Sequence, residues 1–255
     1  MCAKSSTPMS ASHTKAWLAC KQNLESISHM VYMGGREMRL VKAETIRVTN
    51  FLRKKGSNWS KADIAKLERF SQTLESRIDR YMTASSWQVV MLVTCVEAYL
   101  QDLLSAAARV GPELMSESQQ LAPYADVITA TSLDELANDL RARWARGWLS
   151  DGGPTRWISR LEKMGVRGFP SDLAPRLELI WGIRHVIVHA AGIATKDFVK
   201  RHPEVNTAVG NRLRVNSRSF KAFLAPVGSF IELTDTYFLT RFPSLVDPGT
   251  PKASK

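Results

Sequence analysis

Residues 89–108 read VVMLVTCVEAYLQDLLSAAA, the most apolar stretch of the chain, and this stretch decides the fold. Apolar residues occupy nearly every side of a helix drawn over it, which is typical of a helix at the centre of a core. Glu97, Gln101 and Asp102 make the stretch too polar for a membrane span. We therefore expect a buried helix that starts at a serine cap, Ser85 or Ser86, and stops before residues 111–112.

The elements expected around this helix give an all-α protein with at most a short hairpin. Helical spacing and end signals predict helices over residues 15–52, with a break at Gly34-Gly35, and over 60–82, 132–148, 154–163, 172–192 and 217–239. Residues 211–216 alternate enough for a short strand or an extended turn. The predicted organisation is a disordered N-terminus (1–12), an N-terminal helical extension (13–84), a helical domain (85–245) and a disordered tail (246–255).

The chain is basic and contains few cysteines. Its 255 residues carry a net charge of +11, so a polyanion is the expected partner, although a solvated basic surface without a partner explains the charge as well. The three cysteines have no paired spacing, which argues against a disulfide scaffold or a zinc knuckle. Residues 1–12 lack an apolar leader, and no helix pairs a strongly basic face with an exposed apolar one. We expect a cytoplasmic protein without membrane association and without a cofactor.

Polar residues interrupt the apolar segment WGIRHVIVHAAG at positions 181–192. Arg184 offers a fixed positive fork suited to phosphate, while His185 and His189 can give and take protons near neutral pH. At 100° per residue the two histidines share a helix face, whereas Arg184 lies well around the cylinder. For all three to reach one phosphate, the arginine must extend sideways, the helix end must distort, or a second copy of the chain must complete the site.

The histidine face also carries Glu178 and Gly182, and Gly182 would allow a close approach by another backbone. One alternative is that the histidines are hydrogen-bonded imidazoles within a core. Another is a zinc site, because His-x-x-x-His is a ligand spacing and Glu178 or His202 could be the third ligand. Two histidines beside an arginine favour phosphodiester cleavage without a metal, since burying three such groups together without a purpose is costly.

Residues 179–198, LIWGIRHVIVHAAGIATKDF, resemble the signature helix of HEPN domains, which carry Arg, usually a polar residue, and then His after four to six intervening residues. The segment 96–104, VEAYLQDLL, is similar to the other core helix of that family. The resemblance implies a helical bundle over about residues 87–239 that dimerises so that two motif helices line one cleft. It also implies a metal-independent ribonuclease of the kind found in phage-defence or toxin–antitoxin systems. Ala191 departs from a toxin subset that carries Tyr at this position.

The resulting hypothesis is an endoribonuclease in which Arg184, His185 and His189 are catalytic. His189 acts as general acid or base, Arg184 holds the scissile phosphate, and His185 orients the phosphate or carries the second proton. The expected partners are RNA, a second copy of the chain, and an antitoxin or regulatory protein. The rival interpretation is a non-catalytic HEPN-like module that dimerises or binds a nucleotide or a partner.

Two further groups of residues are candidates for supporting roles. Glu97 and Glu178 would support the cluster, Glu97 by pairing with Arg184 across the core, although Glu97 could equally face water at the edge of the bundle. Basic residues with tryptophans between them would suit an RNA surface, at Arg141, Arg143, Arg146, Arg156, Arg160 and Arg167. The alternative is that Trp144, Trp148 and Trp157 face the core and the arginines form a solvated face. We favour the core for the tryptophans and RNA for some of the arginines.

Overall fold

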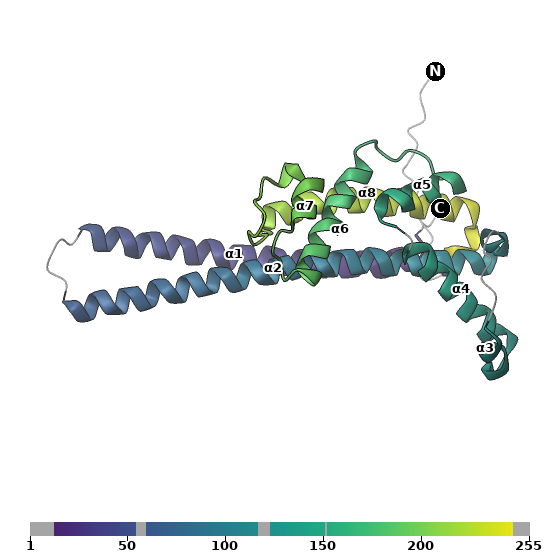
Figure 1. Ribbon diagram of the computed structural model, residues 1–255, viewed down its shortest axis with the longest axis horizontal. Coiled ribbons are helices and arrows are strands. Elements are labelled where there is room, and N and C mark those ends of the chain that lie inside the picture. The colour runs from purple at the N-terminus through teal and green to yellow at the C-terminus, as the bar shows by residue number, and fades with distance from the viewer. Residues whose placement is uncertain (1–12, 55–59, 117–122, 151, 247–255) are drawn as a thin grey trace, which may run out of the picture. The chain divides into compact units, whose positions relative to one another are not determined.

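The computed structural model describes residues 13–54, 60–116, 123–150 and 152–246 (Figure 1). The α-helices of this part are α1 (Lys15–Lys54), α2 (Lys61–Val110), α3 (Tyr124–Thr129), α4 (Leu133–Ser150), α5 (Pro154–Met164), α6 (Leu173–His189), α7 (Lys196–Arg201) and α8 (Ser217–Arg241). Short 3₁₀ helices cover Pro112–Met115, Pro203–Val205 and Pro243–Leu245. The described residues contain no strand, only the isolated bridges Thr14–Val246 and Ile193–Arg212. The predicted all-α class is confirmed, whereas residues 1–12 and most of the predicted disordered tail lie outside the described residues.

The chain forms two compact units, and each is built from segments far apart in the sequence. The first contains residues 1–23, 94–178 and 225–255, and the second contains residues 24–93 and 179–224. Helices α1, α2, α6 and α8 contribute residues to both units. The predicted division into domains at residue 84 stays a prediction.

The core of the first unit forms around the second half of α2. Leu100, Leu104 and Tyr99 of α2 are buried, and the Tyr99 hydroxyl donates a hydrogen bond of 3.2 Å to the carbonyl oxygen of Ile231 in α8. Helix α8 contributes large aromatic side chains to this core, and Phe230 and Phe238 are fully buried. The apolar stretch 89–108 therefore contributes to a core, as expected.

The expectation that polar residues make this stretch too polar for a membrane span is wrong by composition, because the segment Gln72–Val110 of α2 is long and apolar enough to cross a membrane. The central helix of a soluble core passes the same test, and 44% of the most apolar window is buried within the protein. Val89, Val93 and Val96 within it are fully buried. The expected absence of membrane association stays a prediction.

In the second unit, α1 and α2 lie side by side as a long antiparallel hairpin (Figure 1). A β-carbon on Gly34 of α1 would lie 2.8 Å from the ring of Tyr81 in α2, so this glycine lets the aromatic ring approach the helix backbone. The predicted break at Gly34-Gly35 is wrong, because α1 runs through both glycines without interruption. The glycines serve helix packing here and do not end a helix.

The predicted serine cap before residue 87 is also wrong. Helix α2 continues from Lys61 to Val110, and Ser85 and Ser86 lie buried in its interior. The Ser86 hydroxyl donates a 2.8 Å hydrogen bond to the Met82 carbonyl oxygen one turn earlier, so the side chain is satisfied within the helix. Serine favours caps because of its local hydrogen bonds, and such a bond lets Ser86 remain inside a packed helix, whereas the Ser85 hydroxyl is buried without a hydrogen-bond partner among the described residues.

Helix ends predicted from local signals are confirmed at the start of α4, the end of α5 and the start of α6. Ser132 accepts a 3.1 Å hydrogen bond from the Glu135 backbone N–H at the start of α4. Gly165 ends α5 in the left-handed conformation, with φ of +114°. Helix α6 starts directly after Asp172, but it ends at His189, three residues before the predicted end at Gly192.

A buried carboxylate joins α8 to the start of α1 in the first unit. Asp235 is 1% exposed and accepts hydrogen bonds from the backbone N–H and the hydroxyl of Thr14. His13 lies 3.5 Å from the same carboxylate, with its Nδ1 facing Oδ2. Burial raises the pKa of Asp235 despite the opposing hydrogen bonds from Thr14 and the proximity of His13.

This buried carboxylate predicts a pH dependence of stability. Because the pKa of Asp235 is higher in the folded state than in the unfolded state, its contribution to stability is complete below the unfolded pKa. That contribution is lost as the pH rises through the folded pKa. The unfolding free energy of the wild type relative to Asp235→Asn should therefore fall as the pH is raised from about 3.5 towards neutrality. Denaturant titrations over this range measure the difference, and a rise with pH would contradict the prediction.

Candidate functional site

Helix α6 places its two histidines together on its solvent side. His185 and His189 are exposed, and their ring centroids lie 4.6 Å apart at an interplanar angle of 41°. Ile183 and Ile187, on other sides of the helix, are buried. The predicted shared face is confirmed, and the alternative of two imidazoles within a core is wrong. The predicted cost of burying the cluster does not apply to the histidines, because both are open to solvent.

Arg184 occupies a different position on the same helix. It is half-buried, and its Nε atom is enclosed without a hydrogen-bond partner among the described residues. No hydrogen bond or ring contact joins it to His185 or His189 within the described part of the chain. Within one chain the imidazole pair is therefore open to solvent, whereas part of the Arg184 guanidinium is buried. This agrees with the sequence-based expectation that Arg184 lies on a different side of the helix from the histidines.

A third histidine lies close to this face, one turn before His185. A β-carbon on Gly182 would be only 2.6 Å from Nε2 of His202, so the imidazole occupies the space that a side chain would fill. His202 is buried, its ring packs 5.0 Å from that of Phe198, and its Nδ1 lies 3.3 Å from Glu204 Oε1. The expectation that a backbone would approach Gly182 is wrong, because a side chain fills the space.

The zinc alternative gains no support from these positions. Among the residues that the structure describes, no three His, Cys, Asp or Glu side chains are grouped so that they could hold a metal ion. Imidazoles such as those of His185 and His189 can instead take up and release protons.

The two expected supporting carboxylates both belong to the first unit. Glu178 accepts a 2.9 Å hydrogen bond from the backbone N–H of Thr155, so it satisfies a free donor at the start of α5. Glu97 is half-exposed in α2. Arg184 belongs to the second unit, and the pairing of Glu97 with Arg184 stays a prediction.

Several of the arginines predicted to contact RNA are engaged within the first unit. Arg143 pairs with Asp126, Arg160 donates to the Trp148 carbonyl oxygen at 2.6 Å, and Arg167 donates to the carbonyl oxygen of Val166 at 3.2 Å. Arg141 and Arg146 hydrogen-bond to residues of their own helix, and Arg156 is exposed at the start of α5. The core placement of Trp144 and Trp157 is confirmed, whereas Trp148 is half-buried under Arg160.

The sequence around these arginines is also electrically balanced. Residues 124–178 carry eight Lys and Arg residues and eight Asp and Glu residues. Residues 179–224, by contrast, carry eight basic residues against two acidic ones, Asp197 and Glu204. The segment that contains the histidine pair therefore carries six of the eleven net positive charges of the chain, whereas the segment with the densest run of arginines is neutral.

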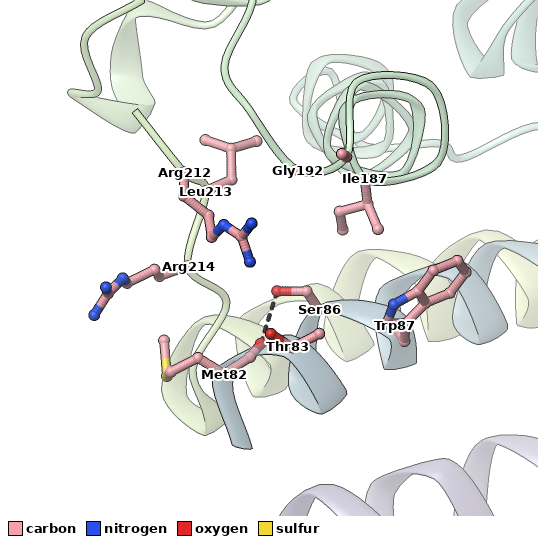
Figure 2. A pocket seen from close by; sticks show the side chains of 10 residues that line it. Met82, Thr83, Ser86, Trp87, Ile187, Gly192, Arg212, Leu213 and Arg214 are labelled. Atoms are coloured by element: carbon pink, nitrogen blue, oxygen red, sulfur yellow. Dashed lines mark hydrogen bonds between the residues drawn. The ribbon is translucent and has the colours of Figure 1, made fainter. Parts of the chain in front are cut away.

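A cavity of about 550 Å³ lies beside the C-terminal end of α6, within the second unit. It is lined by Ile187, the turn at 191–192, the extended segment 212–214 and four residues of α2, which are Met82, Thr83, Ser86 and Trp87. Figure 2 shows the Arg212 guanidinium directed into this space and Arg214 directed away from it. Arg212 and Trp87 carry no signal in the sequence that links them, because only the fold brings residues 125 positions apart to one cavity.

Comparison of the whole chain with family models, curated proteins and solved structures finds no match. The resemblance to HEPN domains thus depends on the residues of segments 179–198 and 96–104 alone.

The contact at Gly182 predicts a specific loss of stability. Gly182→Ala would force a methyl group against the buried His202 ring, and overpacking of this kind costs about 1–3 kcal/mol. Combining the change with His202→Ala should recover much of that loss, as thermal or denaturant unfolding would measure. Gly228→Ala in α8 is the matched control, because nothing lies within 4 Å of its β-carbon position. Equal effects at the two glycines would contradict the proposed contact.

Proposed function

We propose that this protein is a metal-independent endoribonuclease, and the observation that carries the proposal is the exposed imidazole pair on α6. Two histidines whose rings lie 4.6 Å apart can divide the roles of base and acid. A polymer can reach them because both side chains are open to solvent. Arg184, next to His185 in the sequence, supplies a permanent positive charge for phosphate. The resemblance to HEPN domains favours the same chemistry and a setting in phage defence or a toxin–antitoxin pair.

The proposed reaction needs one proton removed and one delivered. One histidine takes the proton of the ribose 2′-hydroxyl as its oxygen attacks the adjacent phosphorus, and the bond from phosphorus to the 5′-oxygen breaks. The other histidine donates a proton to the departing 5′-oxygen. The products are a 2′,3′-cyclic phosphate and a 5′-hydroxyl. Arg184 stabilises the negative charge that develops on the phosphate oxygens, and DNA resists because it lacks the 2′-hydroxyl.

We assign the complete site to a dimer of this chain. Within one copy Arg184 lies on a different side of α6 from the histidines, and its Nε is enclosed. A twofold pairing of α6 helices would bring the arginine of one copy to the histidines of the other. An antitoxin or another regulatory protein could then inhibit the enzyme by covering the exposed histidine face.

Replacement of His189 tests the chemistry. His189→Ala should reduce cleavage of single-stranded RNA by about 10²-fold or more, since it removes one of two proton carriers. His29→Ala, which removes an exposed histidine from α1, should cleave as the wild type does. Product analysis should find the cyclic phosphate, and activity should persist in EDTA. A strict metal requirement would contradict the mechanism, and a wild-type chain that cleaves no RNA would favour a non-catalytic binding module.

Mixing two inactive variants tests the dimer. Arg184→Ala and His189→Ala each lack one part of the site, but a mixed dimer would contain one intact site if each site takes residues from both copies. Random exchange in an equal mixture should then restore about a quarter of the wild-type activity. Cleavage rates before and after mixing show whether activity is restored, and light scattering measures the mass of the assembly. No recovery in a mixture shown to have exchanged subunits would place the whole site within one chain.

A further inference from the structure

We propose that the cavity beside the C-terminal end of α6 binds one nucleotide of the single-stranded RNA substrate. Trp87 would stack on the base and Arg212 would bind a phosphate. The assignment of RNA as the ligand rests on the proposed function, whereas the cavity and its lining residues do not. A volume of about 550 Å³ lies within the range typical of small-molecule pockets and is too small for a folded partner.

Arg212 is placed to bind a phosphate group. Its guanidinium forms no ion pair or hydrogen bond with another described residue, and it points into the cavity (Figure 2). The backbone that carries it is held in place, because Leu213 N donates to Gly192 O and Ala194 N donates to Asn211 O, each at 2.8 Å. A fixed backbone with a free guanidinium lowers the ordering cost of binding an anion through the planar fork.

Trp87 provides the surface for the base. It is 53% exposed although it is the largest apolar side chain of the cavity lining, and it belongs to α2 across the cavity from the Arg212 segment (Figure 2). An indole left open beside a positive charge suits a nucleobase, because stacking is available to every base and the arginine binds the adjoining phosphate. Thr83, exposed on the same helix, adds a hydroxyl at the cavity wall.

The cavity is close enough to the histidines to belong to the same RNA path. Ala191, which lines it, comes two residues after His189, so their Cα atoms are at most about 7 Å apart. Ile187 faces the cavity, whereas the histidines occupy another side of α6. The RNA strand would therefore pass around the end of the helix. The net positive charge of residues 179–224 favours such a path for a polyanion.

Binding measurements on the full chain test the cavity separately from catalysis. We would measure the dissociation constant of a fluorescein-labelled, mixed-sequence RNA of about ten nucleotides by anisotropy, with His189→Ala as the background so that the probe stays intact. Adding Trp87→Ala should weaken binding about tenfold, and Trp87→Phe should recover part of it because a ring remains for stacking. Adding Arg212→Ala should weaken binding to a similar degree and lower the slope of log affinity against log salt by about one.

Arg214→Ala is the matched control. It removes the same charge at a position two residues away, and the Arg214 side chain points out of the cavity. It should weaken binding less than Arg212→Ala. Equal effects of the two arginine variants, or no effect of Trp87→Ala in a folded protein, would overturn the proposed subsite. A free nucleoside monophosphate that binds as tightly as the RNA would also overturn it in favour of a separate nucleotide site. If the cavity variants weaken binding but the wild type cleaves no RNA, the subsite stands and the ribonuclease proposal fails.

Discussion

The burial of one side of α6 is the constraint on which the candidate site depends. Ile183, Val186 and Ile187 are removed from water, and each such side chain contributes about 1.5–3 kcal/mol through the transfer of apolar surface. Once these residues define the rotation of the helix, the 100° step between residues leaves His185 and His189 facing solvent. Arg184 lies between the two environments and is half-buried. The exposed imidazole pair is therefore a consequence of core packing in the second unit.

The end of α6 then determines what lies beside that pair. Ala191 and Gly192 both have positive φ, +50° and +79°, so the chain reverses directly after the last helical turn. Such a conformation is costly for alanine, and the hydrogen bonds from Leu213 N to Gly192 O and from Gly192 N to Val186 O help to hold it. After α7 and the 3₁₀ helix Pro203–Val205, the chain comes back, and the antiparallel bridge Ile193–Arg212 places the segment around Arg212 beside the end of α6. The same pairing of backbone segments therefore holds the turn at 191–192 and places the positive charge of Arg212 beside α6.

Local signals in the sequence predicted helix ends where no distant residue was needed. The Ser132 cap of α4 and the Gly165 end of α5 depend on hydrogen bonds and backbone preferences within a few residues. The same rules failed at Gly34-Gly35 and at Ser85-Ser86, which lie inside continuous helices. At Gly34 the deciding contact is Tyr81, 47 positions further along the chain, so no local rule could have identified it.

The candidate site divides in the same way between sequence and fold. The sequence by itself determined the all-α class and the shared face of His185 and His189, because helical periodicity depends only on spacing along the chain. Only the tertiary structure decided that this face is exposed, that His202 fills the space beside Gly182, and that Trp87 and Arg212 line one cavity. It also showed that Arg143 and Arg160 are engaged within the protein. Exposure and pairing depend on which distant residues compete for the same space, and that information arises only when the chain packs.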